Sequence, residues 1–152
     1  MSIRLLSLLT LAVVVGMAAM TITTSATSAQ PASQTLIAIL RGSEEAPGPG
    51  DPNGIGAARI TLNAAEGEIC ASIGVALIET ATMAHIHAGE RGVAGPVVVH
   101  FTPLLIPGLS VAQGCVPVEP SLIAQIAANP SAYYVNVHNT PFPAGAVRGQ
   151  LR

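Results

Sequence analysis

The sequence predicts an all-β domain, an antiparallel β-sandwich or partly closed barrel with one short helix. Short segments that are apolar, or that alternate apolar and polar residues, recur along the chain. Clusters drawn from the chain's 15 glycines and 12 prolines separate these segments, as turns separate short strands. One segment alone has apolar residues at helical spacing, and no long internal repeat occurs, so neither a helical fold nor a repeat array is expected.

Residues 1–29 are expected to be a signal peptide that precedes a single domain over residues 30–152. Arg4 supplies the positive charge of the first region, an almost wholly apolar stretch follows, and small residues precede Ala29. The apolar stretch is shorter than the about 20 residues that span a bilayer, which favours cleavage over an uncleaved anchor. We therefore expect a secreted, periplasmic or cell-surface protein without stable membrane insertion after cleavage.

The first half of the domain predicts a strand, a loop and a hairpin. Residues 35–40 form a near-continuous apolar run, which is typical of a strand covered on both faces. Residues 42–54 are rich in Gly and Pro and cannot continue a regular element. Residues 57–62 and 68–75 alternate apolar and polar side chains on either side of the short connection 63–67, the pattern of a hairpin.

The second half contains a strand with His85 and His87, a glycine-containing loop, and the helical candidate at residues 119–130. This helix is too short to be stable alone, so it should lie against the strands. Residues 102–114 are expected to cross irregularly, because Pro103, Pro107 and Gly108 interrupt them. The remaining expected strands are residues 96–101, 133–138 and 146–151.

The chain has two cysteines, Cys70 and Cys115, and both follow the expected leader. An even pair of cysteines in a small exported domain most simply forms one disulfide. A thiolate metal site or a nucleophile is the alternative, but there is no Cys-x-x-Cys and no local His-Cys pattern to support it.

Composition excludes several classes of function. After the leader the chain has five arginines against eight acidic residues, so it is too acidic to bind nucleic acid through phosphates. Aromatic residues make up 3% of the chain and tryptophan is absent, which argues against stacking on bases or sugars. There is no nucleophile-elbow serine, no phosphate loop and no carboxylate pair placed near the histidines, so no enzymatic activity is expected.

The strongest site hypothesis is a metal site. His85 and His87 share one face of a strand, because alternate side chains of a strand point to the same side. His138 lies on a later strand and is the expected third ligand, and a set of imidazoles suits copper or zinc. The competing hypothesis is a hydrogen-bonded polar network without an ion, in which Asn136, Arg148 and Gln150 join the histidines.

Several motifs together resemble the CHRD domain, a family named for the repeats of chordin and also found as single-domain exported proteins of microbes. The resemblance covers most of the expected domain, with Glu119 standing where the family would have an aspartate before the helix. The motifs that carry it are residues 40–47 (LRGSEEAP), 84–89 (AHIHAG), 95–99 (GPVVV), 133–138 (YYVNVH) and 143–151 (PAGAVRGQL).

The resemblance implies an immunoglobulin-like β-sandwich in an extracellular or periplasmic location and implies no enzyme. The function we expect is a non-catalytic binding module with a protein or extracellular matrix partner. The alternative is a copper- or zinc-binding protein that uses His85, His87 and His138. The His-x-His pair on a β-sandwich is also similar to copper/zinc superoxide dismutase, although that enzyme's carboxylate and remaining histidines have no clear match in this chain.

Overall fold

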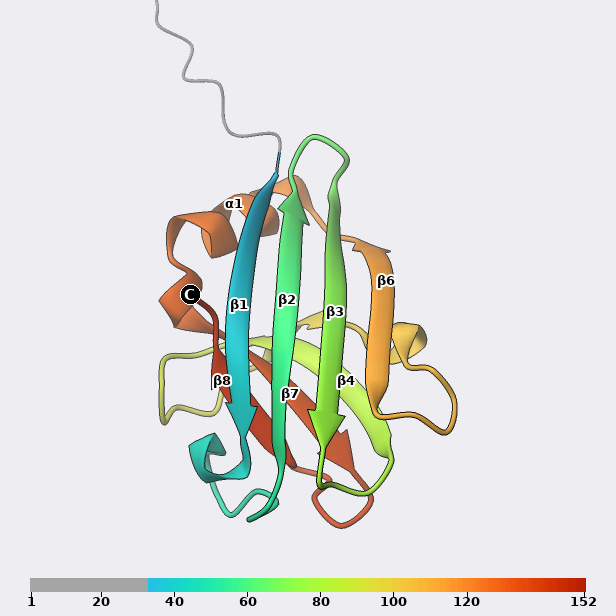
Figure 1. The fold of residues 1–152 in the computed structure, drawn as a ribbon. Helices are drawn as coiled ribbons and strands as arrows, with labels where there is room; N and C mark the ends of the chain where they lie inside the picture. Colours follow the sequence, from blue (N-terminus) through green and yellow to red (C-terminus); the bar gives the residue numbers. More distant parts are fainter. Residues whose placement is uncertain (1–32) are drawn as a thin grey trace, which may run out of the picture.

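A computed structural model describes residues 33–152, in which eight strands form one nearly closed antiparallel sheet (Figure 1). The predicted leader, residues 1–29, lies outside the described residues. The strands are β1 (Gln34–Arg41), β2 (Ile55–Asn63), β3 (Glu68–Ala76), β4 (Ala81–Ala88), β5 (Val97–His100), β6 (Val111–Pro117), β7 (Tyr133–Asn139) and β8 (Val147–Gln150). The helix α1 spans Pro120–Ala128, and the short 3-10 turns are η1 (Gly42–Glu44), η2 (Thr102–Leu104) and η3 (Pro130–Ala132).

The strands lie in two layers in the order β5-β4-β7-β8-β1-β2-β3-β6. In Figure 1 the layer of β1, β2, β3 and β6 stands in front of β4, β7 and β8, and α1 closes one end. The layers join where Arg41 of β1 pairs with Arg148 of β8 and where Ile37 and Arg152 exchange backbone hydrogen bonds. The predicted antiparallel sandwich or partly closed barrel with one short helix is thus confirmed.

The core lies between the layers and is made by alternate residues of each strand. On β1 the inward side chains are Leu36, Ala38 and Leu40, and the other strands alternate in the same way. From α1, Ile123 and Ile126 are fully buried and close the end of the core. The helix begins at Pro120, which tolerates a first-turn position because it lacks only an N–H that no helical carbonyl would accept there.

The prediction that the strand at residues 35–40 is covered on both faces was wrong. Ile37 and Ile39 are 43% and 45% exposed, because no element of residues 33–152 packs over the outer face of β1. The apolar run therefore reflects one buried face and one exposed face that also happens to be apolar.

The irregular crossing predicted for residues 102–114 was wrong at its end, where β6 begins at Val111. Strand β6 pairs with β3 over seven residues, and Cys70 lies directly opposite Cys115. These cysteines form the predicted disulfide, with an S–S distance of 2.06 Å. The glycine and prolines before Val111 shape the loop, but long-range pairing with β3 decides that the segment after it is a strand.

Candidate metal centre

The candidate site lies on the outer face of the layer formed by β4, β7 and β8. Strand pairing sets His85 opposite Asn136 and Asn136 opposite Arg148, so these side chains form one row across three strands. His87 lies opposite Tyr134 in the next row, and Tyr134 lies opposite Gln150. Because alternate residues of a strand share a face, the rows lie side by side. This confirms that His85 and His87 project from the same side of an extended segment.

Loops cover this polar face and bury it. Arg148 is 1% exposed and donates hydrogen bonds to the carbonyl oxygens of Val93 (2.9 Å) and Glu90 (2.7 Å). Gln150 donates to the carbonyl oxygen of Gly89 at 2.7 Å. The loop at residues 89–96 is therefore tied down over the sheet by side chains of β8.

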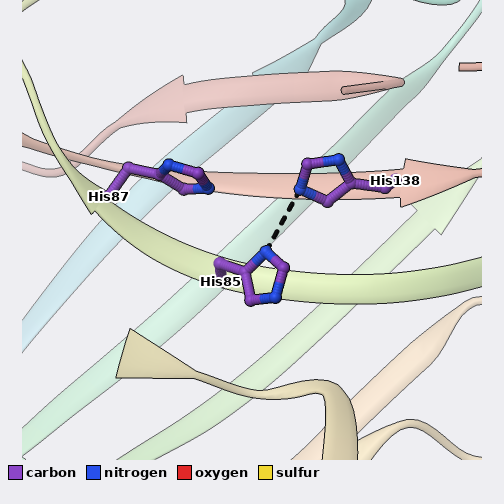
Figure 2. A group of neighbouring side chains, drawn as sticks. All are labelled: His85, His87 and His138. Atoms are coloured by element: carbon purple, nitrogen blue, oxygen red, sulfur yellow. Dashed lines mark hydrogen bonds between the residues drawn. The ribbon is translucent and has the colours of Figure 1, made fainter. Parts of the chain in front are cut away.

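The three histidines named in the metal hypothesis converge. His85, His87 and His138 each offer a ring nitrogen, and these nitrogens lie within 4.8 Å of one another. His85 Nδ1 and His138 Nε2 are 3.2 Å apart, and Figure 2 shows the ring of His87 turned towards that of His138. His85 and His138 are 6% and 5% exposed, so the group lies below the molecular surface.

Backbone carbonyls fix the protonation of two of these rings. His87 Nδ1 lies 2.9 Å from the carbonyl oxygen of Gly95, and His138 Nδ1 lies 3.1 Å from that of Pro143. A carbonyl oxygen only accepts, so each Nδ1 carries the hydrogen and each Nε2 of the neutral ring keeps a free lone pair. His87 Nε2 is buried and has no hydrogen-bond partner among the described residues.

His85 can adopt either of two protonation patterns. Its Nε2 lies 3.4 Å from the hydroxyl of Thr102, which also accepts a hydrogen bond from the Ala84 backbone N–H. With hydrogen on Nδ1, His85 donates to His138 Nε2 and the group is a hydrogen-bonded network. With hydrogen on Nε2, donated to Thr102, three imidazole lone pairs face one another and offer three ligands to a cation.

Burial keeps the three rings neutral. Desolvation, together with the smaller effects of the neighbouring imidazoles of His138, His87 and His100, lowers the pKa of His85 to about 4. Desolvation also lowers the pKa of His87 and of His138. Neutral imidazole is the form that binds a metal ion, so the rings do not need to lose a proton to water at neutral pH in order to act as ligands.

Arg148 does not point at the histidine group. Its guanidinium carbon lies 3.4 Å from the centre of the Tyr134 ring, and that ring stacks on His87 with centroids 4.9 Å apart. The cation is thus held by an aromatic face and by loop carbonyls. Among the predicted network residues, Arg148 and Gln150 anchor the covering loop rather than joining the imidazoles by hydrogen bonds.

Glu45 is a site residue that sequence reasoning placed on a solvated loop and did not connect with the histidines. It follows η1, and its carboxylate accepts two hydrogen bonds from Asn136 Nδ2, at 3.0 and 2.9 Å. Desolvation raises the pKa of Glu45 to about 7, against the lowering effects of Asn136 and Arg148. Glu45 is 91 positions from Asn136 in the chain, so no local pattern could have paired them.

His100 lies beside the group but outside it. It is paired with His85 across β4 and β5, and the two ring centroids are 5.0 Å apart. Its side chain is exposed, and it is the last residue of β5. A second cluster, Glu68 with Cys70 and Cys115, offers no thiolate ligands, because the two sulfurs are bonded to each other.

Comparison with known proteins gave one match. The family model described as CHRD domain matches residues 36–151, which is nearly all of the part of the chain that the structure describes. No curated protein and no solved structure matches the chain significantly. In residues 33–152, none of the helices has the length and apolar character needed to cross a membrane.

Proposed function

Because this chain belongs to the CHRD domain family, we propose that it is an exported, non-catalytic binding module that holds one copper or zinc ion through His85, His87 and His138. The observation that carries the proposal is the convergence of three neutral imidazoles within 4.8 Å, one of them with a buried Nε2 that has no partner among residues 33–152.

The geometry needs little adjustment to hold an ion. Tetrahedral coordination at about 2.0 Å places ligand nitrogens about 3.3 Å apart. His85 Nδ1 and His138 Nε2 already meet this spacing at 3.2 Å. His87 offers the third nitrogen, within 4.8 Å of the other two, and has to move closer to them to share the ion. The carbonyls of Gly95 and Pro143 that accept from the Nδ1 atoms are the kind of outer partner that orients histidine ligands in metal sites.

The proposed export rests on two general observations, the family and the disulfide, and neither specifies a compartment. CHRD domains are of an extracellular type, and the Cys70–Cys115 disulfide indicates an oxidising compartment. The family is in general one of protein-interaction modules, and the expected protein or matrix partner remains part of this proposal. Superoxide dismutase activity stays a prediction that rests on the similarity of the His-x-His pair to copper/zinc superoxide dismutase. The three-residue group contains histidines alone and lacks the carboxylate ligand of that enzyme.

The test is the metal content of the full chain purified from its native compartment. We expect about one equivalent of copper or zinc by elemental analysis. In His87→Gln and His138→Gln variants the content should fall by at least about tenfold, because each removes one of three ligands.

The matched control is His100→Gln, which removes the fourth histidine but none of the three proposed ligands, and it should retain its metal. Circular dichroism confirms that each variant is folded. A folded wild-type protein that holds no metal and takes up neither Cu²⁺ nor Zn²⁺ on titration would overturn the metal function and leave the hydrogen-bonded network.

A further inference from the structure

Three arginines line one small pocket where β8 pairs with β1. The histidine group lies on the other neighbour of β8, strand β7, and on β4. Arg41 comes from the end of β1, Arg91 from the loop at residues 89–96, and Arg152 from the residues after β8. Glu44 of η1 lies at the same pocket. The described part of the chain has five arginines in all, so more than half of its basic side chains meet at this point.

The pocket forms where the two layers of the sheet join. Strands β1 and β8 pair at Arg41 and Arg148, and they are joined again by the backbone bonds between Ile37 and Arg152. Gly149 lies between these two points and lines the pocket. A Cβ on Gly149 would lie 2.2 Å from the carbonyl oxygen of Ile39, so any side chain at this position would push β1 and β8 apart.

The arginines outnumber the carboxylates at this pocket. A single guanidinium nitrogen of Arg91, Nη1, donates to both carboxylate oxygens of Glu44 and forms an ion pair with them. In residues 33–152, Arg41 and Arg152 have no acidic side chain within ion-pair distance. The chain before residue 33 contains no acidic residue that could pair with them. Three guanidinium side chains against one carboxylate side chain leave an excess of positive side-chain charge at the pocket, in a domain whose overall charge is negative.

We propose that this pocket binds a dianionic tetrahedral oxyanion, a sulfate or phosphate group. Guanidinium groups present pairs of parallel N–H donors that match the oxygens of such anions, and a dianion neutralises the excess charge. The backbone of Gly149 lines the pocket beside the arginines. The site is independent of the proposed metal function, because its residues do not include the three histidines proposed as metal ligands.

The experiment is a titration of the full chain with sodium sulfate and sodium phosphate at constant ionic strength. Binding is followed by the NMR signals of the Gly149 amide and the arginine Nε–H groups. We expect saturable shifts with both dianions, and binding weaker by about tenfold with acetate, which carries half the charge. Equal binding of acetate, or shifts that grow linearly without saturation, would overturn the proposal.

Substitutions at the pocket separate a built site from general attraction. Arg41→Gln and Arg152→Gln should each weaken sulfate binding by about tenfold, through loss of a charge-assisted hydrogen bond. Arg59→Gln removes the same charge from an exposed position on β2 outside the pocket and should leave the affinity nearly unchanged. If Arg59→Gln weakens binding as much as Arg41→Gln, the effect is a diffuse field and the proposal fails.

Glu44→Gln gives a result of the opposite sign. The carboxylate of Glu44 occupies Arg91 in the free protein and competes with the incoming anion. Removing its charge should therefore tighten sulfate binding several-fold, roughly the size of an exposed ion pair. A Glu44→Gln variant that binds sulfate more weakly than the wild type would show that the carboxylate supports the site, contrary to the proposal. Neither result depends on whether the protein holds copper or zinc.

Discussion

At the scale of single residues, hydrogen bonding decides which atoms of the candidate metal centre are available. The carbonyls of Gly95 and Pro143 occupy Nδ1 of His87 and His138, which leaves both Nε2 lone pairs free to face inwards. A ring without such an acceptor could present either nitrogen. Two backbone contacts outside the imidazole group thus decide which nitrogen of His87 and of His138 faces inwards.

His85 and Glu45 have pKa values shifted in opposite directions, so each makes the free energy of unfolding depend on pH in the opposite sense to the other. His85, faced by His138, His87 and His100, has its pKa lowered from 6.5 to about 4. The contribution of His85 to the free energy of unfolding is complete above pH 6.5. It is lost as the pH falls towards 4, because His85 binds a proton more readily in the unfolded chain than in the folded one. Glu45, faced by Asn136 and Arg148, has its pKa raised from 4.5 to about 7. Its contribution is therefore lost as the pH rises from 4.5 to 7.

We expect the metal-free Glu45→Gln variant to show a steeper rise of unfolding free energy with pH than the wild type between pH 4.5 and 6.5. The amide retains the size of the side chain but removes the opposing titration. Urea unfolding across this range, in the presence of a chelator, measures the slope. Glu66→Gln is the control, since Glu66 is exposed and should leave the slope as it was. Parallel curves for the Glu45 variant and the wild type would contradict the assignment.

At the scale of elements, the loop at residues 89–96 converts the outer face of a sheet into a buried site. Arg148 of β8 donates a hydrogen bond to the loop. The carbonyl oxygen of Gly95 accepts from His87, and the Gly95 N–H donates to the Tyr134 hydroxyl at 3.2 Å. The same loop carries Arg91 to the anion pocket. One covering loop therefore contributes to both proposed sites.

Gly95→Ala should damage both the fold of this loop and the metal centre. An added Cβ would lie 1.6 Å from the carbonyl oxygen of Ala88, which is backbone and cannot turn aside. We expect a loss of about 2 kcal/mol in unfolding free energy from this overpacking. Metal affinity should fall roughly tenfold, because the partner that orients His87 is displaced.

The control for this substitution is Gly74→Ala in β3. A Cβ on Gly74 would meet nothing within 4 Å, so its unfolding free energy should stay within about 0.5 kcal/mol of the wild type. Urea denaturation and competition with a chromogenic chelator measure the two quantities. A Gly95→Ala protein as stable as Gly74→Ala would show that the loop is free to shift.

At the scale of the whole molecule, the disulfide fastens the edge strand β6 to the sheet. Cys70 and Cys115 are 45 positions apart and lie opposite each other on β3 and β6. Closing a loop of this length should contribute about 4 kcal/mol through the entropy of the unfolded chain. The bond matters at this position because β6 pairs with β3 alone among the described strands.

We therefore expect the Cys70→Ala, Cys115→Ala double variant to unfold at a markedly lower urea concentration than the wild type, with a loss of about 4 kcal/mol. Removing both cysteines avoids leaving a free thiol. The native protein should also resist alkylation until a reductant is added. Alkylation of both cysteines in folded protein without reductant, or an unchanged urea midpoint, would contradict this role.

Local patterns predicted the elements whose causes are local. Alternation predicted the β2–β3 hairpin and the shared face of His85 and His87, and Asn129 and Pro130 correctly marked the end of α1. The first strand was placed correctly, but its burial was not, because an apolar run does not reveal whether a second layer covers it. Strand β6 was missed in part, because its pairing with β3 lies far away in the chain.

The sequence by itself determined the fold class, the disulfide and which histidines share a strand face, because these follow from side-chain periodicity and from the number of cysteines. Only the tertiary structure decided that His138 meets His85, that Glu45 reaches Asn136, and that three arginines gather beside Gly149. These contacts join residues that are distant in the chain. Their partners are chosen by strand order and by the path of the covering loops, which no local pattern specifies.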